Sequence, residues 1–198
     1  MIEFNDLLKE KPYFKFKQIY NKALAANQKN IEAICIASYS AQNNYVDSRF
    51  VNLKSIHKNE FIFYTNYESP KAYQFKTHNQ ICVVIFWQNI NTQIRIHANI
   101  RKIKTKESDN YFRKRSLKKN ALSISSHQSQ QIKSYQQVED NYLHCINDKS
   151  LTTRPKYWGG YSFVPYYFEF WEGHESRLNK RDAFKLDNNQ WHHSILQP

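Results

Sequence analysis

Glycine is scarce in this chain, and the motifs that depend on it are missing. The 198 residues include three glycines, two of which are the adjacent Gly159 and Gly160. The sequence contains no G-x-G-x-x-G motif and no Walker-type loop, the two common glycine-rich phosphate-binding loops. Nothing therefore favours a parallel, doubly wound nucleotide-binding fold.

Cysteine is also scarce, and its placement excludes two classes of protein. Cys35, Cys82 and Cys145 are an odd number, lie far apart and form no C-x-x-C pair. We interpret them as buried thiols in a reducing compartment, and not as a disulfide framework or a zinc site. The histidines form no H-x-H or H-x-x-x-H pattern with carboxylates nearby, so no metal site is expected.

Long apolar runs are absent as well. No window of the sequence approaches the length of a membrane span, and the first residues, "MIEFNDLLKEK", show no apolar core of a signal peptide. We expect a cytoplasmic protein with no membrane partner.

Acidic residues are outnumbered by basic ones, 17 to 29, which gives a formal net charge of +12. Such an excess favours an anionic partner, whether nucleic acid, membrane surface or a phosphorylated small molecule. Because lysine is spread along the whole chain, only clustered charges distinguish these partners. Nucleic-acid binding rests here on charge and interleaved aromatics alone.

The apolar pattern predicts a mainly β fold with flanking helices. Residues 5–28 have a helical period, with Asp6 as a cap and a break at Pro12. Strands are expected in "IEAICIASYS", "RFVNLKSIH", "EFIFYTN", "QICVVIFW" and "TQIRIHANIRKIK", and later in "YYFEFWEG", "AFKLD" and "WHHSIL", with "DNNQ" as a hairpin turn. We expect one domain over residues 1–198, an antiparallel barrel with an N-terminal helical segment over 1–30 and a helical excursion over 105–150.

The helical excursion is expected to start at Thr105 as its cap. Its predicted buried side chains are Tyr111, Phe112, Tyr135, Val138, Tyr142 and Leu143.

Two short stretches carry basic residues where a phosphate could bind. In "SRFVNLKS", Arg49 and Lys54 are expected on opposite faces of a regular strand, because their separation is odd. In "NYESPKAY", Ser69 is expected to cap a helix that starts at Pro70 and has Lys71 in its first turn. A helix N-terminus with a lysine is suited to an anion.

Other polar positions are less specific. Gln128 and Ser129 lie in the polar stretch "HQSQQ" and could donate hydrogen bonds to a phosphate or a flavin ring edge. No G-x-S-x-G motif and no obvious Cys-His pair indicates a protein nucleophile.

Taken together, "RFVNLK", "FYTNYESPKAYQ", "FWQNINTQIRI", "QSQQI" and "WGGYSFVPYYFEFWEGHESRLNKR" resemble the pyridoxamine 5'-phosphate oxidase family in order and spacing. The resemblance runs from about Ile31 to the terminal "ILQP". It implies an FMN-binding, homodimeric Greek-key split barrel, with FMN at the subunit interface. It also implies oxidation of pyridoxamine or pyridoxine 5'-phosphate to pyridoxal 5'-phosphate, with oxygen as electron acceptor and hydrogen peroxide as product.

The resemblance also implies the site residues. The cofactor-binding positions are Arg49, Lys54, Tyr64, Thr65, Ser69, Lys71, Gln93, Gln128, Ser129, Trp171 and Arg181, several of them supplied by the partner subunit. The substrate-binding positions are Lys54, Tyr111, Arg115, Lys119 and Arg177. Arg177 and Asn179 are the candidate catalytic residues.

Three positions depart from the family pattern. Asn179 stands where the family has a histidine, and an amide cannot carry a proton as imidazole does. Pro70 replaces a basic residue, and Lys119 replaces a serine. The basic N-terminal segment of many members is also expected to be missing.

The resemblance and its departures leave three functions open. The chain is a vitamin B6 phosphate oxidase, a related FMN oxidase acting on another small ring substrate, or a flavin or pyridoxal phosphate binding protein with little turnover.

Overall fold

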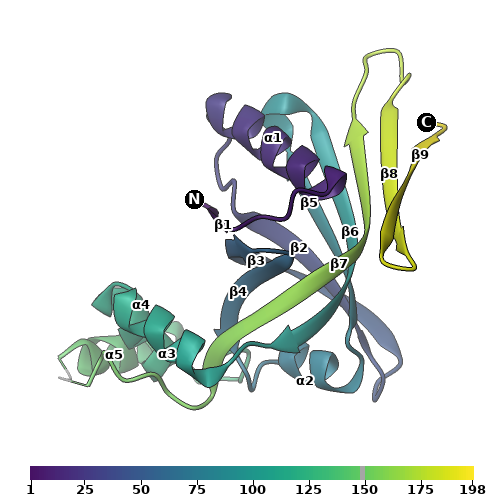
Figure 1. The fold of residues 1–198 in the computed structure, drawn as a ribbon. Helices are drawn as coiled ribbons and strands as arrows, with labels where there is room; N and C mark the ends of the chain where they lie inside the picture. Colours follow the sequence, from purple (N-terminus) through teal and green to yellow (C-terminus); the bar gives the residue numbers. More distant parts are fainter. Residues whose placement is uncertain (148–149) are drawn as a thin grey trace.

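A closed barrel of antiparallel strands forms the centre of the molecule in the computed structural model, which describes residues 1–147 and 150–198 (Figure 1). The strands follow one another around the barrel as β3–β2–β5–β6–β7–β4 and back to β3. Their bounds are β2 (Ala33–Ser40), β3 (Tyr45–His57), β4 (Glu60–Asn66), β5 (Gln80–Trp87), β6 (Thr92–Lys102) and β7 (Trp158–Glu172). The predicted strands and the mainly β architecture are confirmed.

Strand β7 is long and connects the barrel to a hairpin at one end of the molecule. Its first residues, up to Phe163, pair with β4, and its last residues, from Tyr167, pair with β8 (Lys180–Asp187). The last strand, β9 (Gln190–Leu196), pairs with β8. Asn188 and Asn189 join these strands with φ of 47° and 61°, the left-handed conformation of a tight hairpin turn, so the predicted "DNNQ" turn is confirmed.

The inside of the barrel is filled by alternate residues of each strand. On β6 the predicted alternation holds, since Ile94, Ile96 and Ala98 are fully buried while the side chains between them are half-buried. One end of this core is closed by helix α1 (Lys11–Ala25), which buries Phe16 edge-on against Phe61 with ring centroids 5.3 Å apart. The residues between the buried ones form an outer sheet face.

The N-terminal segment differs from the prediction. A short strand, β1 (Glu3–Asn5), pairs in parallel with β3, and Asp6 lies in the link after it with φ of 48° instead of capping a helix. Pro12 sits in the first turn of a single helix, where the backbone N–H has no helical partner to lose. The predicted break at Pro12 is therefore wrong.

The excursion after β6 forms an arm beside one end of the barrel (Figure 1). It contains α3 (Thr105–Lys114), α4 (Leu117–Ser125) and α5 (Tyr135–Ile146). Phe112 is fully buried as predicted, but Tyr135 and Leu143 are 76% and 58% exposed and α5 has no buried residue, so the prediction of buried positions on this helix is wrong. Asp148 and Lys149, at the end of the predicted excursion, lie outside the described residues.

Two short helices complete the fold. Helix α2 (Pro70–Thr77) follows β4, and the 3-10 helix η1 (Gln88–Ile90) follows β5. In the part of the chain that the structure describes, no helix has the length and apolar character needed to span a membrane.

Candidate functional site

A cavity of about 1300 Å³ opens between the barrel wall and the helical arm. It is formed mainly by β3, β4, the start of α2 and the arm, with the N-terminal strand at its edge. Most of the residues predicted to bind cofactor or substrate line it: Arg49, Lys54, Tyr64, Thr65, Lys71, Tyr111, Arg115, Lys119, Gln128 and Ser129.

Lys71 and Arg49 bring positive charge to the cavity wall where α2 begins. Lys71 is buried, with 6% of its surface exposed, and its Nζ donates to Ser69 Oγ at 3.0 Å. Burial, followed by repulsion from Arg49, lowers the pKa of Lys71 to about 8. Asp47 balances part of this charge, with 2.5 Å between its Oδ2 and Arg49 Nη2. The pair is therefore suited to an incoming anion with two charges, such as a phosphate.

Arg49 is held by polar groups that the sequence analysis missed. Its Nη1 donates to Ser38 Oγ at 2.6 Å, and its Nη2 donates to Gln74 Oε1 at 2.9 Å. Ser38 and Gln74 are themselves buried and hydrogen-bonded to each other. No sequence motif marks them, because they come from β2 and α2 and meet only in the folded chain.

Ser69 and Pro70 begin helix α2 as predicted, although the serine acts differently. Its hydroxyl donates to the backbone oxygen of Asn66 at 2.8 Å and accepts from Lys71, instead of capping the helix. Ser69 is thus fully buried behind Lys71.

The expectation that Arg49 and Lys54 lie on opposite faces is wrong, because β3 is not regular. Its pairing with β4 shifts register between Leu53 and Ser55, and both basic side chains reach the same cavity. Lys54 Nζ lies 2.8 Å from Glu32 Oε1. Burial acts to raise the pKa of Glu32, but Lys54 and the chain's N-terminal ammonium hold it below its usual value.

An aromatic wall faces these basic groups. Tyr64 and Tyr111 stack with ring centroids 3.7 Å apart and planes within 4°, and Trp158 continues the stack 5.4 Å from Tyr64. The guanidinium of Arg115 lies over Trp158, 4.4 Å from the ring centroid. This wall offers a flat apolar surface next to a cation.

The wall explains why glycines follow Trp158. A Cβ at Gly160 would come within 2.3 Å of Ile103 Cδ1 and 2.9 Å of Tyr64 Cε1, and a Cβ at Gly159 would overlap the hydroxyl of Tyr67 at 2.2 Å. Only glycine lets these side chains pack directly on the strand backbone.

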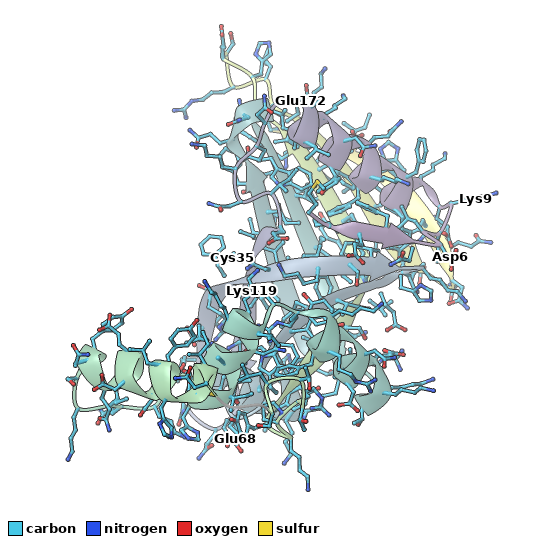
Figure 2. All side chains as sticks on the ribbon, turned by 90° about the vertical axis from the view of Figure 1, so that its left-hand side faces the viewer. Asp6, Lys9, Cys35, Glu68, Lys119 and Glu172 are labelled. Atoms are coloured by element: carbon cyan, nitrogen blue, oxygen red, sulfur yellow. The ribbon has the colours of Figure 1, made fainter. Side chains whose placement is uncertain are left out.

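Gln93, Trp171 and Arg181 are the predicted cofactor residues that the structure places elsewhere. They form one row across β6, β7 and β8, since Gln93 is opposite Trp171 and Trp171 is opposite Arg181. Because β7 runs the length of the molecule, this row and the cavity lie at different ends (Figure 1). Figure 2 shows the separation, with Glu172 of β7 far from Lys119 of the arm.

The two candidate catalytic residues also lie outside the cavity lining. They belong to the loop between β7 and β8, where Asn179 Oδ1 accepts a hydrogen bond from the His174 N–H at 3.0 Å. Arg177 adopts φ of 60°, and its N–H donates to the His174 carbonyl at 2.9 Å. Asn179 therefore shapes the loop that presents Arg177.

Comparison with protein families gives a clear assignment. Residues 20–145 match the model described as pyridoxamine 5'-phosphate oxidase. Residues 158–198 match the model described as the pyridoxine 5'-phosphate oxidase C-terminal dimerisation region. The chain belongs to the pyridoxamine 5'-phosphate oxidase family. It is accordingly an FMN-dependent oxidase by type, as the sequence resemblance implied.

Curated members of the pyridoxamine 5'-phosphate oxidase family cover nearly the whole chain. The pyridoxine/pyridoxamine 5'-phosphate oxidase of Legionella pneumophila (strain Paris) is 34% identical over 189 residues, which is 94% of this chain and 87% of the relative. The enzyme of the same name from Cytophaga hutchinsonii is 34% identical over 180 residues, or 89% and 83% of the two chains.

Solved structures confirm the split-barrel fold. PhzG from Burkholderia lata, solved in complex with tetrahydrophenazine-1-carboxylic acid, aligns with a TM-score of 0.88 and 25% identity over 95% of this chain and 93% of its own. A pyridoxamine 5'-phosphate oxidase-related, FMN-binding protein from Nostoc punctiforme aligns with a TM-score of 0.78 and 14% identity over 96% and 100%. The latter likeness concerns the fold alone.

Proposed function

We propose that the protein oxidises pyridoxamine 5'-phosphate or pyridoxine 5'-phosphate to pyridoxal 5'-phosphate, with FMN as cofactor and oxygen as electron acceptor. The observation that carries the proposal is the cavity in which the buried Lys71 and Arg49 face an aromatic wall with Arg115. Such a site offers cations for phosphate groups and flat surfaces for rings. The names of the curated relatives support this substrate class.

The residues of the cavity fit FMN. Lys71 is a buried ammonium that makes no ion pair among the described residues, and a phosphate would supply the missing counter-charge. Arg49 would join it at the phosphate and Ser69 would hold the Lys71 ammonium in place, while Lys54, Tyr64, Thr65 and the Gln128–Ser129 pair would contact the rest of the cofactor. When bound, FMN supplies the hydride acceptor and passes the electrons to oxygen, giving hydrogen peroxide.

The site is completed, on this proposal, by a second subunit. Gln93, Trp171 and Arg181 do not line the cavity of their own chain, and Trp171 and Arg181 belong to the stretch that matches a dimerisation region. On the same outer sheet face Phe50 and Phe86 are 75% and 53% exposed. Exposed aromatic side chains among polar groups are typical of a subunit interface. A homodimer would bring each row to the partner's cavity.

The substrate would be held beside the flavin by its phosphate and its ring. Lys54, Tyr111, Arg115 and Lys119 all line the cavity and would bind the phosphate of the substrate. Arg177 would come from the partner's loop and hold the ring over the flavin, so that binding fixes the orientation of the reacting carbon. Asn179 would stand beside it.

A second candidate function follows from the likeness to PhzG. Its bound molecule is a ring carboxylic acid. The same cations could bind a carboxylate, and the departures at Asn179 and Lys119 lie among the proposed substrate contacts. The alternative is therefore an FMN oxidase for another small ring acid, and a flavin-binding protein with little turnover is the third possibility.

Anaerobic mixing of the FMN-loaded protein with pyridoxamine 5'-phosphate tests the proposal. Bleaching of the flavin absorption band is expected. An unchanged spectrum with this substrate, together with bleaching by a reduced phenazine carboxylic acid, would support the second candidate. If neither compound bleaches the flavin band, the third possibility, a flavin-binding protein with little turnover, is the one supported.

We further propose a cytoplasmic location and no nucleic-acid partner. Salt-sensitive binding of single-stranded or duplex nucleic acid would contradict the absence of such a partner.

A further inference from the structure

Glu169 is a buried carboxylate on the outer face of β7 and lies outside the cavity lining. It falls within the stretch that carries the family resemblance, but no role was assigned to it there. Only 2% of the residue is exposed. Its Oε2 accepts from Arg95 Nη1 at 3.0 Å and from the Tyr167 hydroxyl at 3.1 Å. Its Oε1 accepts from Arg181 Nε at 2.9 Å and lies 2.9 Å from Arg181 Nη2. One carboxylate therefore holds two guanidinium groups.

Strand register explains how these groups meet. Arg95 on β6 is opposite Glu169, two residues along the strands from the pair of Gln93 and Trp171 and therefore on the same face. Arg181 on β8 is opposite Trp171 and reaches diagonally to Glu169. The carboxylate thus lies directly beside the row proposed to contact the flavin.

Glu169 fixes the orientation of the Arg181 side chain. Two of the three guanidinium nitrogens face Glu169, and the third, Nη1, donates to the backbone oxygen of Gln197 at 2.9 Å. An arginine side chain otherwise samples many rotamers, and immobilising it on ligand binding costs free energy. A guanidinium held in place before binding avoids that cost.

Glu169 also balances part of the positive charge of Arg95 and Arg181. The two arginines and one carboxylate leave a net positive charge on a face that is only partly exposed. Without Glu169, the guanidiniums of Arg95 on β6 and Arg181 on β8 would repel each other across β7, and Arg181 would turn toward solvent.

We propose that Glu169 is a positioning residue for the flavin site, acting through Arg181. It holds the guanidinium in the direction in which it meets FMN in the partner's cavity. The inference rests on the proposed function, because it takes Arg181 as a flavin contact.

The test is FMN affinity in a double-mutant cycle. We expect Glu169→Gln to weaken FMN binding roughly tenfold, the size of one lost charge-assisted contact. In an Arg181→Gln background the same change should alter the affinity less than about twofold, because the residue it acts through is already gone. Glu172→Gln, which removes an exposed carboxylate from the same strand, is the matched control and should bind FMN like the wild type.

Two results would overturn the inference. One is wild-type affinity in Glu169→Gln; the other is an equal loss with and without Arg181, which indicates a general structural role. The absorption maximum of bound FMN gives a second readout, expected to shift in Glu169→Gln and to stay unchanged if only folding stability is lost.

A further variant covers the case in which Glu169→Gln fails to fold. Glu169→Gln combined with Arg95→Gln restores the net charge of the group but leaves Arg181 without its anchor. This double variant should fold but should bind FMN more weakly than the wild type. Wild-type affinity in the double variant would refute the inference. A wild-type protein that takes up no FMN would instead refute the proposed function, so the two failures are distinguishable.

Discussion

The Thr65 hydroxyl donates a hydrogen bond of 3.3 Å to the side-chain oxygen of Gln128, joining the end of β4 to the loop between α4 and α5. These residues are 63 positions apart in the chain. Their contact holds the helical arm at the mouth of the cavity, so that barrel and arm form one binding surface. On the proposed function, this surface is one half of a site shared between two subunits.

The cations at the buried end of the cavity should dominate cofactor affinity. We expect Arg49→Ala or Lys71→Ala to weaken FMN binding by about 1–3 kcal/mol, the usual cost of losing a charged hydrogen-bond partner. Quenching of flavin fluorescence measures the affinity. Lys76→Ala, an exposed lysine on the same helix, is the control and should have no effect. Unchanged affinity in both cavity variants would contradict the site assignment.

Cofactor binding should also depend on pH through Lys71. Its pKa is lowered to about 8, so above that pH the free protein loses the ammonium that attracts phosphate, and binding must take up a proton. FMN affinity should therefore fall as pH rises above 8, by up to about tenfold per unit. Lys71→Arg stays charged and should flatten the profile. Riboflavin, which lacks the phosphate, should show little of this dependence; an equal slope for both ligands would argue against a phosphate at Lys71.

Asn179 should limit turnover. Asn179→His should raise the rate of pyridoxamine 5'-phosphate oxidation several-fold, because imidazole adds a group that titrates near neutral pH. Asn179→Ala should lower it, since the hydrogen bond from the His174 N–H is lost and the loop that presents Arg177 loosens. Steady-state kcat and KM, measured with FMN saturating, check both. Wild-type rates in both variants would show that the position is dispensable.

Acid stability should depend on Asp182. Burial acts to raise its pKa, but hydrogen bonds from Lys15 and His193 lower it below the usual value. A carboxylate with a lowered pKa stabilises the fold above its unfolded pKa, near 4, and this contribution is lost as pH falls through the folded pKa. Asp182→Asn should lower the free energy of unfolding at pH 7 by on the order of 0.5 kcal/mol and flatten its decline below about pH 4. Urea unfolding measures this, with Asp187→Asn in the exposed turn as the control; identical pH profiles for Asp182→Asn and wild type would contradict it.

Much of the barrel could be predicted because its signals are local. Alternation of Ile94, Ile96 and Ala98 with polar residues marks a strand with one buried face, and two asparagines mark the last hairpin. The prediction at Pro12 was wrong because a proline within a helical pattern can mark either a break inside a helix or the first turn of one. In the structure Pro12 lies in the first turn.

The site was predictable only in part. Most residues that the family resemblance implied line one cavity, whereas Gln93, Trp171, Arg181, Arg177 and Asn179 lie outside it, and the roles of all of them remain predictions. Ser38, Gln74 and Glu169 were missed because each acts through a contact between distant segments, and the bulge that turns Lys54 into the cavity depends on pairing with β4. Tyr135 was wrongly predicted to be buried because the apolar spacing of α5 does not lead to a packed face in the structure.

The central claim is that one flavin site is built from two subunits, and subunit complementation tests it most directly. Homodimers of Lys71→Ala and of Arg181→Ala should each bind FMN weakly. In a mixed dimer, one site receives both changes and the other receives neither. We predict that purified mixed dimers bind one FMN per dimer with wild-type affinity. Weak binding at both sites of the mixed dimer would contradict the shared site.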